Sequence, residues 1–254
     1  MVEQATENRC VGGSIPPLGT FQMYKLIYFF LIILLFTSCK KRDENFFPYK
    51  QGMTWTYKVF LKSSYTGKSQ EKRLLVTNIK THKKREGVEF FRLHSNGNYY
   101  KYFVDKFNNK ITRLSALFNY GEGLTEPINR EIYPDLLFEK KNWESTEQLF
   151  LTRGYQPPVR NFRPESKFTM NYSLKKKMKT FKHRRNTFKN CLYIVGTGST
   201  SFIADSRSGP LKVEIKSEEW ICNNVGTVLE KRYEETKASA FGNSTFIKEL
   251  IQLK

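Results

Sequence analysis

The sequence predicts a mainly β protein, an antiparallel meander of sandwich or barrel size that follows an N-terminal signal helix. Three observations predict this class. Aromatic residues make up 15% of the 254 residues, and aromatic and β-branched residues favour strands. Apolar and polar residues alternate in several short runs, which is the period of a half-buried strand. Glycine, proline and asparagine separate these runs, as they do in hairpin turns.

The N-terminal segment contains an apolar run over 26–36 that is too short to span a membrane. It has eleven residues, whereas a helix rising about 1.5 Å per residue needs about 20 to cross a hydrocarbon core. Lys25 precedes the run and small residues follow at 37–38, in the order of a secretory signal peptide. The alternative is an uncleaved anchor, but the basic residues at 40–42 would then keep the large domain in the cytoplasm.

Cys39 directly follows this signal, and the run from Phe36 to Cys39, FTSC, resembles the lipobox of bacterial lipoproteins. The resemblance implies that Cys39 receives a diacylglyceryl group, becomes the mature N-terminus and carries palmitate-like acyl chains. Each buried methylene of such a chain contributes about 0.8 kcal/mol, so two or three chains anchor a protein firmly to a membrane.

The resemblance also sets the expected organisation of the chain. Residues 1–38 form an N-terminal extension and signal peptide, 39–45 a tether, and 46–254 an antiparallel β-domain. The segment 1–22 is polar and precedes a second methionine, Met23, which we expect to be the true start.

The expected location is therefore the bacterial cell envelope, with the domain anchored by lipid to a membrane. Lys40 and Lys41 do not match an aspartate-type retention signal, so resemblance to known sorting patterns favours the outer membrane in a double-membraned cell. The net charge of +19 survives removal of 1–38, because that segment holds two basic and two acidic residues. A strongly basic envelope protein is expected to contact anionic surfaces.

The domain divides into alternating runs that we expect to be strands. Turn signals lie at Asn96–Asn98 and at Asn108–Asn109, a proline-led strand is expected around Trp143, and the glycine-serine run at 196–201 is expected to be a turn. Only the C-terminal tail has apolar residues at the spacing of a helix. The expected strand runs are 54–62, 71–79, 88–95, 98–114, 191–198, 200–206, 211–222, 225–237 and 246–254.

Two short motifs bracket the domain and resemble those of a broad group of bacterial lipoproteins and secreted β-proteins. The opening motif comprises Phe47, Pro48, Gly52, Trp55 and Tyr57, and the late motif Trp220, Val225, Gly226 and Val228. The resemblance spans roughly 47–230. It implies an antiparallel sheet curled into an open barrel, comparable with lipoprotein-carrier folds of the envelope, and it implies no particular activity. The basic segment described next is not part of this pattern.

A basic segment at about 155–190 is expected to be an insertion in the domain. From Arg160 to Lys189 it holds eleven basic residues and one acid. Such a segment attracts polyanions. The signal peptide disfavours nucleic acid and favours anionic lipid, lipopolysaccharide or acidic glycan. The alternative is a solvated loop or a basic strand pair with no partner. The candidate anion-binding residues are Lys175, Lys176, Lys177, Lys179, Lys182, Arg184 and Arg185.

Cys191 and Cys222 are the two cysteines left in the mature domain once Cys39 is acylated. An exported protein can form disulfides, so they are a candidate pair. A bridge closing about 30 residues would contribute on the order of 3 kcal/mol. The alternative is two separate buried thiols.

The sequence offers little for catalysis. His82, His94 and His183 lack zinc-site spacing, with His82 and His183 expected to be exposed, and the adjacent acids at 218–219 and at 234–235 should face opposite sides of a strand. The tryptophans are expected in the core. We therefore expect no enzyme, cofactor or metal, and a binding or scaffolding lipoprotein at an anionic envelope surface. The alternatives are a carrier or chaperone holding a lipid or acyl chain in a curved sheet, or a hydrolase.

Overall fold

The computed structural model describes residues 44–65, 67–107, 110–118, 124–133, 142–151, 167–204 and 209–254. These residues form strands and turns without any helix, so the prediction of a mainly β protein is confirmed. Within these ranges no helix could therefore cross a bilayer. The predicted signal helix and Cys39 lie outside the described residues.

Twelve strands are present in the described residues. They are β1 (Thr54–Ser63), β2 (Ser69–Lys83), β3 (Gly87–His94), β4 (Tyr99–Asp105), β5 (Ile111–Phe118), β6 (Leu124–Tyr133), β7 (Asn142–Gln148), β8 (Lys167–His183), β9 (Asn186–Ile203), β10 (Pro210–Cys222), β11 (Gly226–Thr236) and β12 (Asn243–Leu253).

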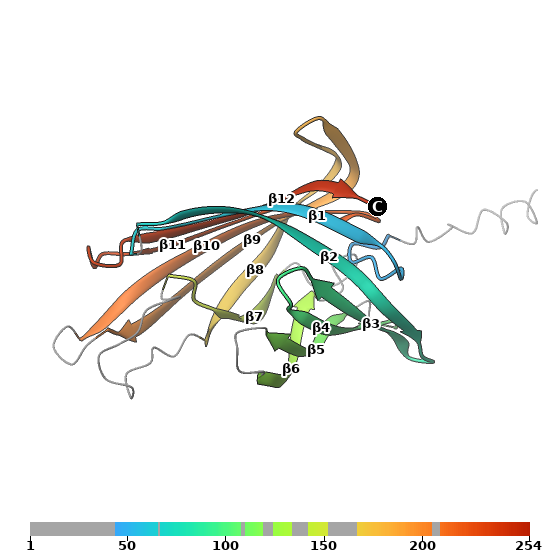
Figure 1. Cartoon of the computed structure of the whole chain (residues 1–254), viewed down its shortest axis with the longest axis horizontal. Helices are drawn as coiled ribbons and strands as arrows, with labels where there is room; N and C mark the ends of the chain where they lie inside the picture. Colours follow the sequence, from blue (N-terminus) through green and yellow to red (C-terminus); the bar gives the residue numbers. More distant parts are fainter. Residues whose placement is uncertain are drawn as a thin grey trace, which may run out of the picture. The chain divides into compact units, whose positions relative to one another are not determined.

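The strands form one antiparallel sheet in the order β6-β5-β4-β3-β2-β1-β12-β11-β10-β9-β8-β7. Every neighbouring pair is consecutive in the chain except β1 and β12, which join the two termini. The sheet curls, so that Tyr133 of β6 and Trp143 of β7 bring their rings within 6.3 Å. No ladder joins β6 to β7 over the part of the chain described. The meander is therefore a single open, curled sheet and not a sandwich of two sheets (Figure 1).

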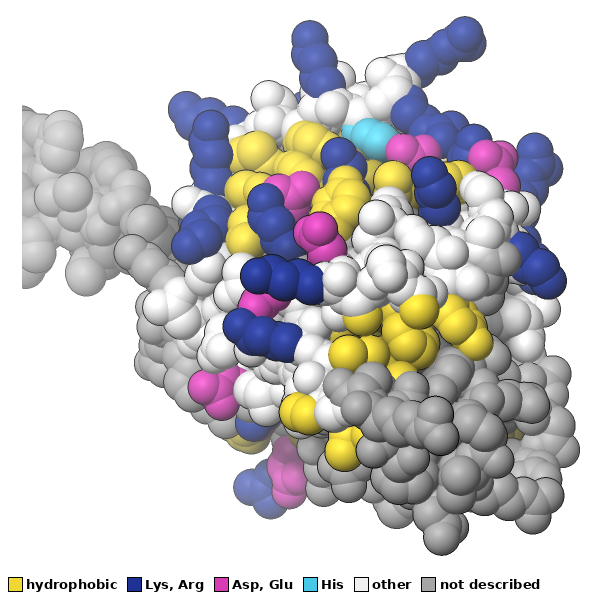
Figure 2. All heavy atoms as spheres, turned by 90° about the vertical axis from the view of Figure 1, so that its left-hand side faces the viewer, with side chains coloured by type: hydrophobic (Ala, Val, Ile, Leu, Met, Phe, Trp, Pro, Cys, Tyr) yellow, Lys and Arg dark blue, Asp and Glu magenta, His cyan; other side chains and the backbone are white. Residues whose placement is uncertain are grey.

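The turns between strands alternate between two ends of the sheet, because consecutive strands are antiparallel neighbours. We call the end where the chain begins β1 and leaves β12 the tether end. The β2–β3, β4–β5, β8–β9 and β10–β11 turns belong to it. The β1–β2, β3–β4, β9–β10 and β11–β12 turns belong to the far end. The β1–β2 and β11–β12 turns lie at the left of Figure 1. Figure 2 views the far end, where hydrophobic side chains gather between Lys and Arg side chains.

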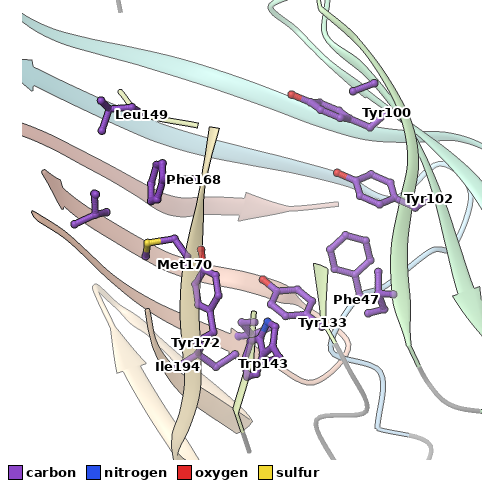
Figure 3. Close-up of a cluster of buried hydrophobic side chains, with 14 of the residues drawn as sticks. Phe47, Tyr100, Tyr102, Tyr133, Trp143, Leu149, Phe168, Met170, Tyr172 and Ile194 are labelled. Carbon is purple, nitrogen blue, oxygen red and sulfur yellow. The ribbon is translucent and has the colours of Figure 1, made fainter. Parts of the chain in front are cut away.

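The concave face of the sheet holds an aromatic core. Figure 3 shows Tyr100, Tyr102 and Phe47 on one side of this core, with Phe168 and Met170 on the other. Residues from opposite walls of the curl thus bury one another's apolar surface, at about 25 cal/mol per Å². The buried members of this core include Phe46, Phe47, Phe90, Tyr100, Tyr102, Tyr133, Trp143, Phe168, Met170, Tyr172, Ile194, Val213, Ile215 and Ile221.

The glycine-serine run at 196–201 lies inside β9, so the prediction of a turn there is wrong. A Cβ on Gly196 would lie 2.6 Å from Cε1 of Tyr172, and one on Gly198 would lie 2.6 Å from Sδ of Met170. The glycines leave room for the large side chains of β8, which pair with them across the ladder. The C-terminal segment, expected as a strand over 246–254, is the strand β12.

The opening and late motifs contact each other near the tether end. Nε1 of Trp55 donates a hydrogen bond to the carbonyl of Val225 at 2.6 Å, and the Tyr57 hydroxyl donates one to the carbonyl of Thr227 at 3.1 Å. Gly226 has a φ of +84°, which favours glycine, and its Cβ position would lie 3.4 Å from Cδ of Pro48. Both motifs therefore serve one packing contact between β1 and the β10–β11 turn.

Candidate functional site

The predicted basic segment, over its described part, forms the β8–β9 hairpin, whose strands are hydrogen-bonded members of the sheet. One side of the hairpin packs on the rest of the domain. Phe181 stacks on Trp220 of β10 with ring centroids 5.6 Å apart, and Met178 and Phe188 pack beside the same cluster as Cys191. The hairpin is therefore fixed to the sheet by its apolar side chains.

All seven predicted anion-binding side chains are exposed on this hairpin, as is Lys189. Figure 2 shows Lys and Arg side chains projecting at the top, the height at which the hairpin rises in Figure 1. Arg184 pairs with Glu249 of β12. Within the described ranges, Lys175, Lys176 and Arg185 have no carboxylate at ion-pair distance. The structure thus gathers these positive charges on one projecting element. Arg160 and Arg163 lie outside the described residues.

The β10–β11 turn connects the base of this hairpin to the start of the domain. The backbone N–H of Asn45 donates to Oδ1 of Asn223 at 2.7 Å, and Asn224 N–H donates to the Asn45 carbonyl at 2.7 Å. On its other side Asn223 N–H donates to the carbonyl of Asn190 at 3.0 Å. The residue that ends the predicted tether and the base of the basic hairpin are therefore held by the same turn.

The structure brings Cys191 and Cys222 together at the root of the hairpin. Their sulfur atoms are joined at 2.04 Å, and the two residues are directly opposite each other on β9 and β10. Both side chains are buried. A bridge here would fix the hairpin strand β9 to the sheet.

A group of charged side chains on the concave face was not predicted from the sequence. Glu219, Glu230 and Lys248 face one another across the ladders of β10, β11 and β12. Lys248 pairs with Glu230, and the hydroxyl of Tyr133 donates to Oε2 of Glu219 at 2.8 Å. Burial and then the Glu219 charge raise the pKa of Tyr133. Burial opposes the charge on Lys248, but Glu230, Tyr57 and Glu219 outweigh it and raise the Lys248 pKa.

Arg92 lies in the same interior and pairs with no carboxylate of the described ranges. Its Nε donates to Oδ1 of Asn78 at 2.9 Å and its Nη2 to the carbonyl of Pro48 at 3.0 Å. The guanidinium also lies 4.5 Å from the ring centre of Phe47 and 4.7 Å from that of Trp55. Burial lowers the pKa of Arg92. Arg92 thus fastens the opening motif to β3 through polar and cation–π contacts.

A second charged group fixes the chain that follows β7. Glu234 of β11 is buried and pairs with Nη2 of Arg232 at 2.7 Å. The same carboxylate accepts the backbone N–H of Phe150 at 2.8 Å and that of Leu151 at 2.6 Å. Nη1 of Arg232 lies 3.5 Å from Glu147. This arrangement ties the chain that follows β7 to β11.

Part of this interior could have been recognised in the sequence. Glu230, Arg232 and Glu234 follow one another with a spacing of two, so all three belong to one face of β11. The predicted separation of Glu234 from Glu235 is confirmed, since the first is buried and the second exposed. Which strands bring partners to that face depends on the sheet order, which local patterns do not reveal.

The other predicted residues have structural surroundings. The predicted core positions Trp55 and Trp143 are buried, whereas Trp220 stacks between Phe181 and Tyr193. The prediction of exposure is wrong for His82 and His183, which are half-buried. His183 stacks on Phe181. Over the described residues, no set of three His, Cys, Asp or Glu side chains could hold a metal ion.

Comparisons with known proteins give weak likenesses. No protein family and no curated protein matches the sequence. A protein from Parabacteroides distasonis ATCC 8503 that is designated a lipoprotein has a TM-score of 0.44 and 14% identity, over 83% of this chain and 99% of that chain. A protein from Bacteroides fragilis NCTC 9343, designated as exported and with a YmcC-like fold, has a TM-score of 0.38 and 12% identity, over 83% and 99%. Neither likeness carries a functional conclusion.

Proposed function

We propose that this chain is a non-catalytic lipoprotein of the bacterial cell envelope, anchored through Cys39, whose β8–β9 hairpin binds the anionic surface of the membrane that holds the anchor. One observation carries the proposal. Asn223 contacts both Asn45, where the tether ends, and Asn190, at the base of the hairpin. The start of the described domain, to which the tether connects, and the base of the basic hairpin therefore belong to the same end of the sheet.

The tether is short enough to keep the hairpin near the bilayer. Six residue steps separate Cys39 from Asn45, and a chain extends at most about 3.6 Å per residue, so the two are within about 22 Å. Electrostatic attraction is screened beyond a Debye length of about 8–10 Å. Each Lys or Arg close to an anionic leaflet contributes about 1 kcal/mol. Several such side chains would therefore orient the anchored domain with the hairpin toward the head groups.

The interior of the sheet favours this surface function over the carriage of an acyl chain. The concave face contains the charged side chains of Arg92, Glu230 and Lys248 among its aromatic rings. An acyl chain lying against them would remove polar groups from water without offering hydrogen bonds, at a cost of several kcal/mol for charged groups. An apolar ligand is therefore poorly matched to the described interior.

Vesicle binding by a soluble chain that begins at Lys40 tests the proposal. We expect binding to anionic vesicles that weakens as salt rises, and a loss of roughly 100-fold when Lys175, Lys176 and Lys177 are changed to Gln. A matched control changes three exposed far-end lysines to Gln, namely Lys62, Lys68 and Lys237, and should leave most of the binding intact. Binding that ignores salt, or equal losses in the two variants, would contradict the role of the hairpin.

A further inference from the structure

Phe107, in the β4–β5 turn, is the most exposed large hydrophobic side chain of the described residues. It is 76% exposed, whereas Leu75, the next, is 44% exposed. Single exposed apolar residues are common on protein surfaces. Phe107 differs from the others because it belongs to a turn at the tether end, beside a second turn that carries exposed basic side chains.

The β4–β5 turn is held against the β2–β3 turn. Lys106 N–H donates to the carbonyl of Glu86 at 3.0 Å, and Nζ of Lys106 donates to the carbonyl of Lys84 at 3.2 Å. Within its own turn, Phe107 N–H donates to Oδ1 of Asp105 at 2.7 Å. Exposed basic side chains flank the pair of turns, namely Lys80, Lys83, Lys84, Arg85 and Lys106. Of these, Lys84 pairs with Glu89 at 2.8 Å.

The β2–β3 turn follows a contact with the first described residues of the domain. The Thr81 hydroxyl donates to the carbonyl of Tyr49 at 2.8 Å, four residues after Asn45. From Thr81, three strand steps of about 3.3 Å lead to Lys84, a distance of about 10 Å. The β2–β3 and β4–β5 turns therefore lie at the same tether end of the sheet as the basic hairpin.

The described turn residues also differ in charge between the two ends of the sheet. Those at the tether end include the basic Lys84, Arg85, Lys106, Lys110, Arg184 and Arg185 and the acidic Glu86. Those at the far end include Lys68 and Lys237. An anionic surface would therefore attract the tether end more strongly than the far end.

We propose that the β4–β5 turn inserts Phe107 into the boundary between head groups and acyl chains of an anionic bilayer, with the flanking lysines and arginine contacting the head groups. The inference rests on the proposed function, because it takes the same membrane as the partner. An aromatic ring gains from leaving water there, while long basic side chains keep their charges at the polar level. Phe107 thereby adds a fixed contact point to the lipid anchor.

Depth-dependent fluorescence quenching of the full-length lipidated protein tests this inference. The protein is reconstituted in phosphatidylcholine–phosphatidylglycerol vesicles with and without brominated acyl chains, as wild type, as Phe107→Trp and as Ile203→Trp. Ile203, which is 43% exposed and ends β9 at the far end, is the matched control. The emission added at position 107 should shift to shorter wavelength and be quenched by the brominated chains. The emission added at position 203 should remain unquenched.

Two results would overturn the inference. One is emission at position 107 that stays at the wavelength of a water-exposed indole and is unquenched in vesicles. The other is a short-wavelength emission that is already present in detergent and insensitive to bromine, which would mean a protein contact in place of lipid. Because the lipid anchor holds every variant on the vesicle, these readings do not depend on the hairpin lysines. Failure of the hairpin proposal would appear separately, in the salt dependence of the soluble chain.

Discussion

Substitution of Glu234 by Ala is expected to destabilise the domain more than any single surface change. The carboxylate is 1% exposed. It pairs with Arg232 at 2.7 Å and accepts two backbone N–H groups, from Phe150 and Leu151. Its removal leaves a buried guanidinium and two backbone donors without this partner.

The magnitude follows from those contacts. Breaking a buried ion pair by removing one partner costs about 3–5 kcal/mol, and the lost hydrogen bonds to a charged acceptor belong to the same network, so the terms do not simply add. We expect the free energy of unfolding to fall by about 4 kcal/mol. For a domain of this size, that lowers the melting temperature by roughly 10 °C.

Chemical denaturation and thermal melting of paired variants provide the assay. Glu235→Ala is the control, because Glu235 is the exposed neighbour on the other face of β11, and it should change stability by less than about 0.5 kcal/mol. A further change of Arg232 to Met in the Glu234→Ala background should restore part of the loss, since both charges are then gone. Equal stability of Glu234→Ala and Glu235→Ala would refute the role of this buried ion pair in holding the chain after β7 against β11.

Three other predictions concern stability. Burial, with the charges of Lys248 and Arg92, lowers the pKa of His94 to about 3, so the stability from its neutral form is present above about pH 6.5 and is lost as pH falls toward 3. Between pH 7 and pH 4 the unfolding free energy of the wild type, measured in urea titrations, should fall by up to about 3 kcal/mol more than that of His94→Gln. Equal decreases in the two proteins would contradict this prediction. Reduction, or the double change Cys191→Ser and Cys222→Ser, should lower the unfolding free energy by about 3 kcal/mol; an unchanged mass after alkylation without reductant would argue for the bridge, and labelling of both thiols against it. Gly196→Ala should cost about 1–3 kcal/mol through contact with Tyr172, whereas Ser199→Ala, at an exposed position of the same strand, should be nearly neutral.

Most strands were predictable because concave-facing residues alternate with outward ones, but none of the expected strand runs covers β6 or β8. In β1, Trp55 and Tyr57 alternate with threonine and lysine, and this pattern requires only local information. The same reasoning failed at Gly196 and Gly198, because glycine usually marks a turn. Here the residue that explains each glycine, Tyr172 or Met170, lies on the neighbouring strand, more than twenty residues away.

The two proposed membrane-contacting features, the β8–β9 hairpin and Phe107, also differ in how far the sequence predicts them. The basic character of the β8–β9 hairpin is a property of composition and was predictable from the sequence. Its position beside Asn45 depends on Asn223, a residue more than thirty positions after the hairpin tip. The exposure of Phe107 could not be predicted either, because an aromatic residue between two strands is normally expected to pack into the core.

Our proposals require that Cys39 carries a lipid. They also require that the tether end of the domain, which holds the basic hairpin, therefore lies at a membrane. The most direct measurement is the intact mass of the protein extracted from membranes, with fragmentation of its N-terminal peptide. We expect a chain that starts at Cys39 and carries a diacylglyceryl group on that residue. A soluble chain that retains residues 23–38, with an unmodified Cys39, would contradict it.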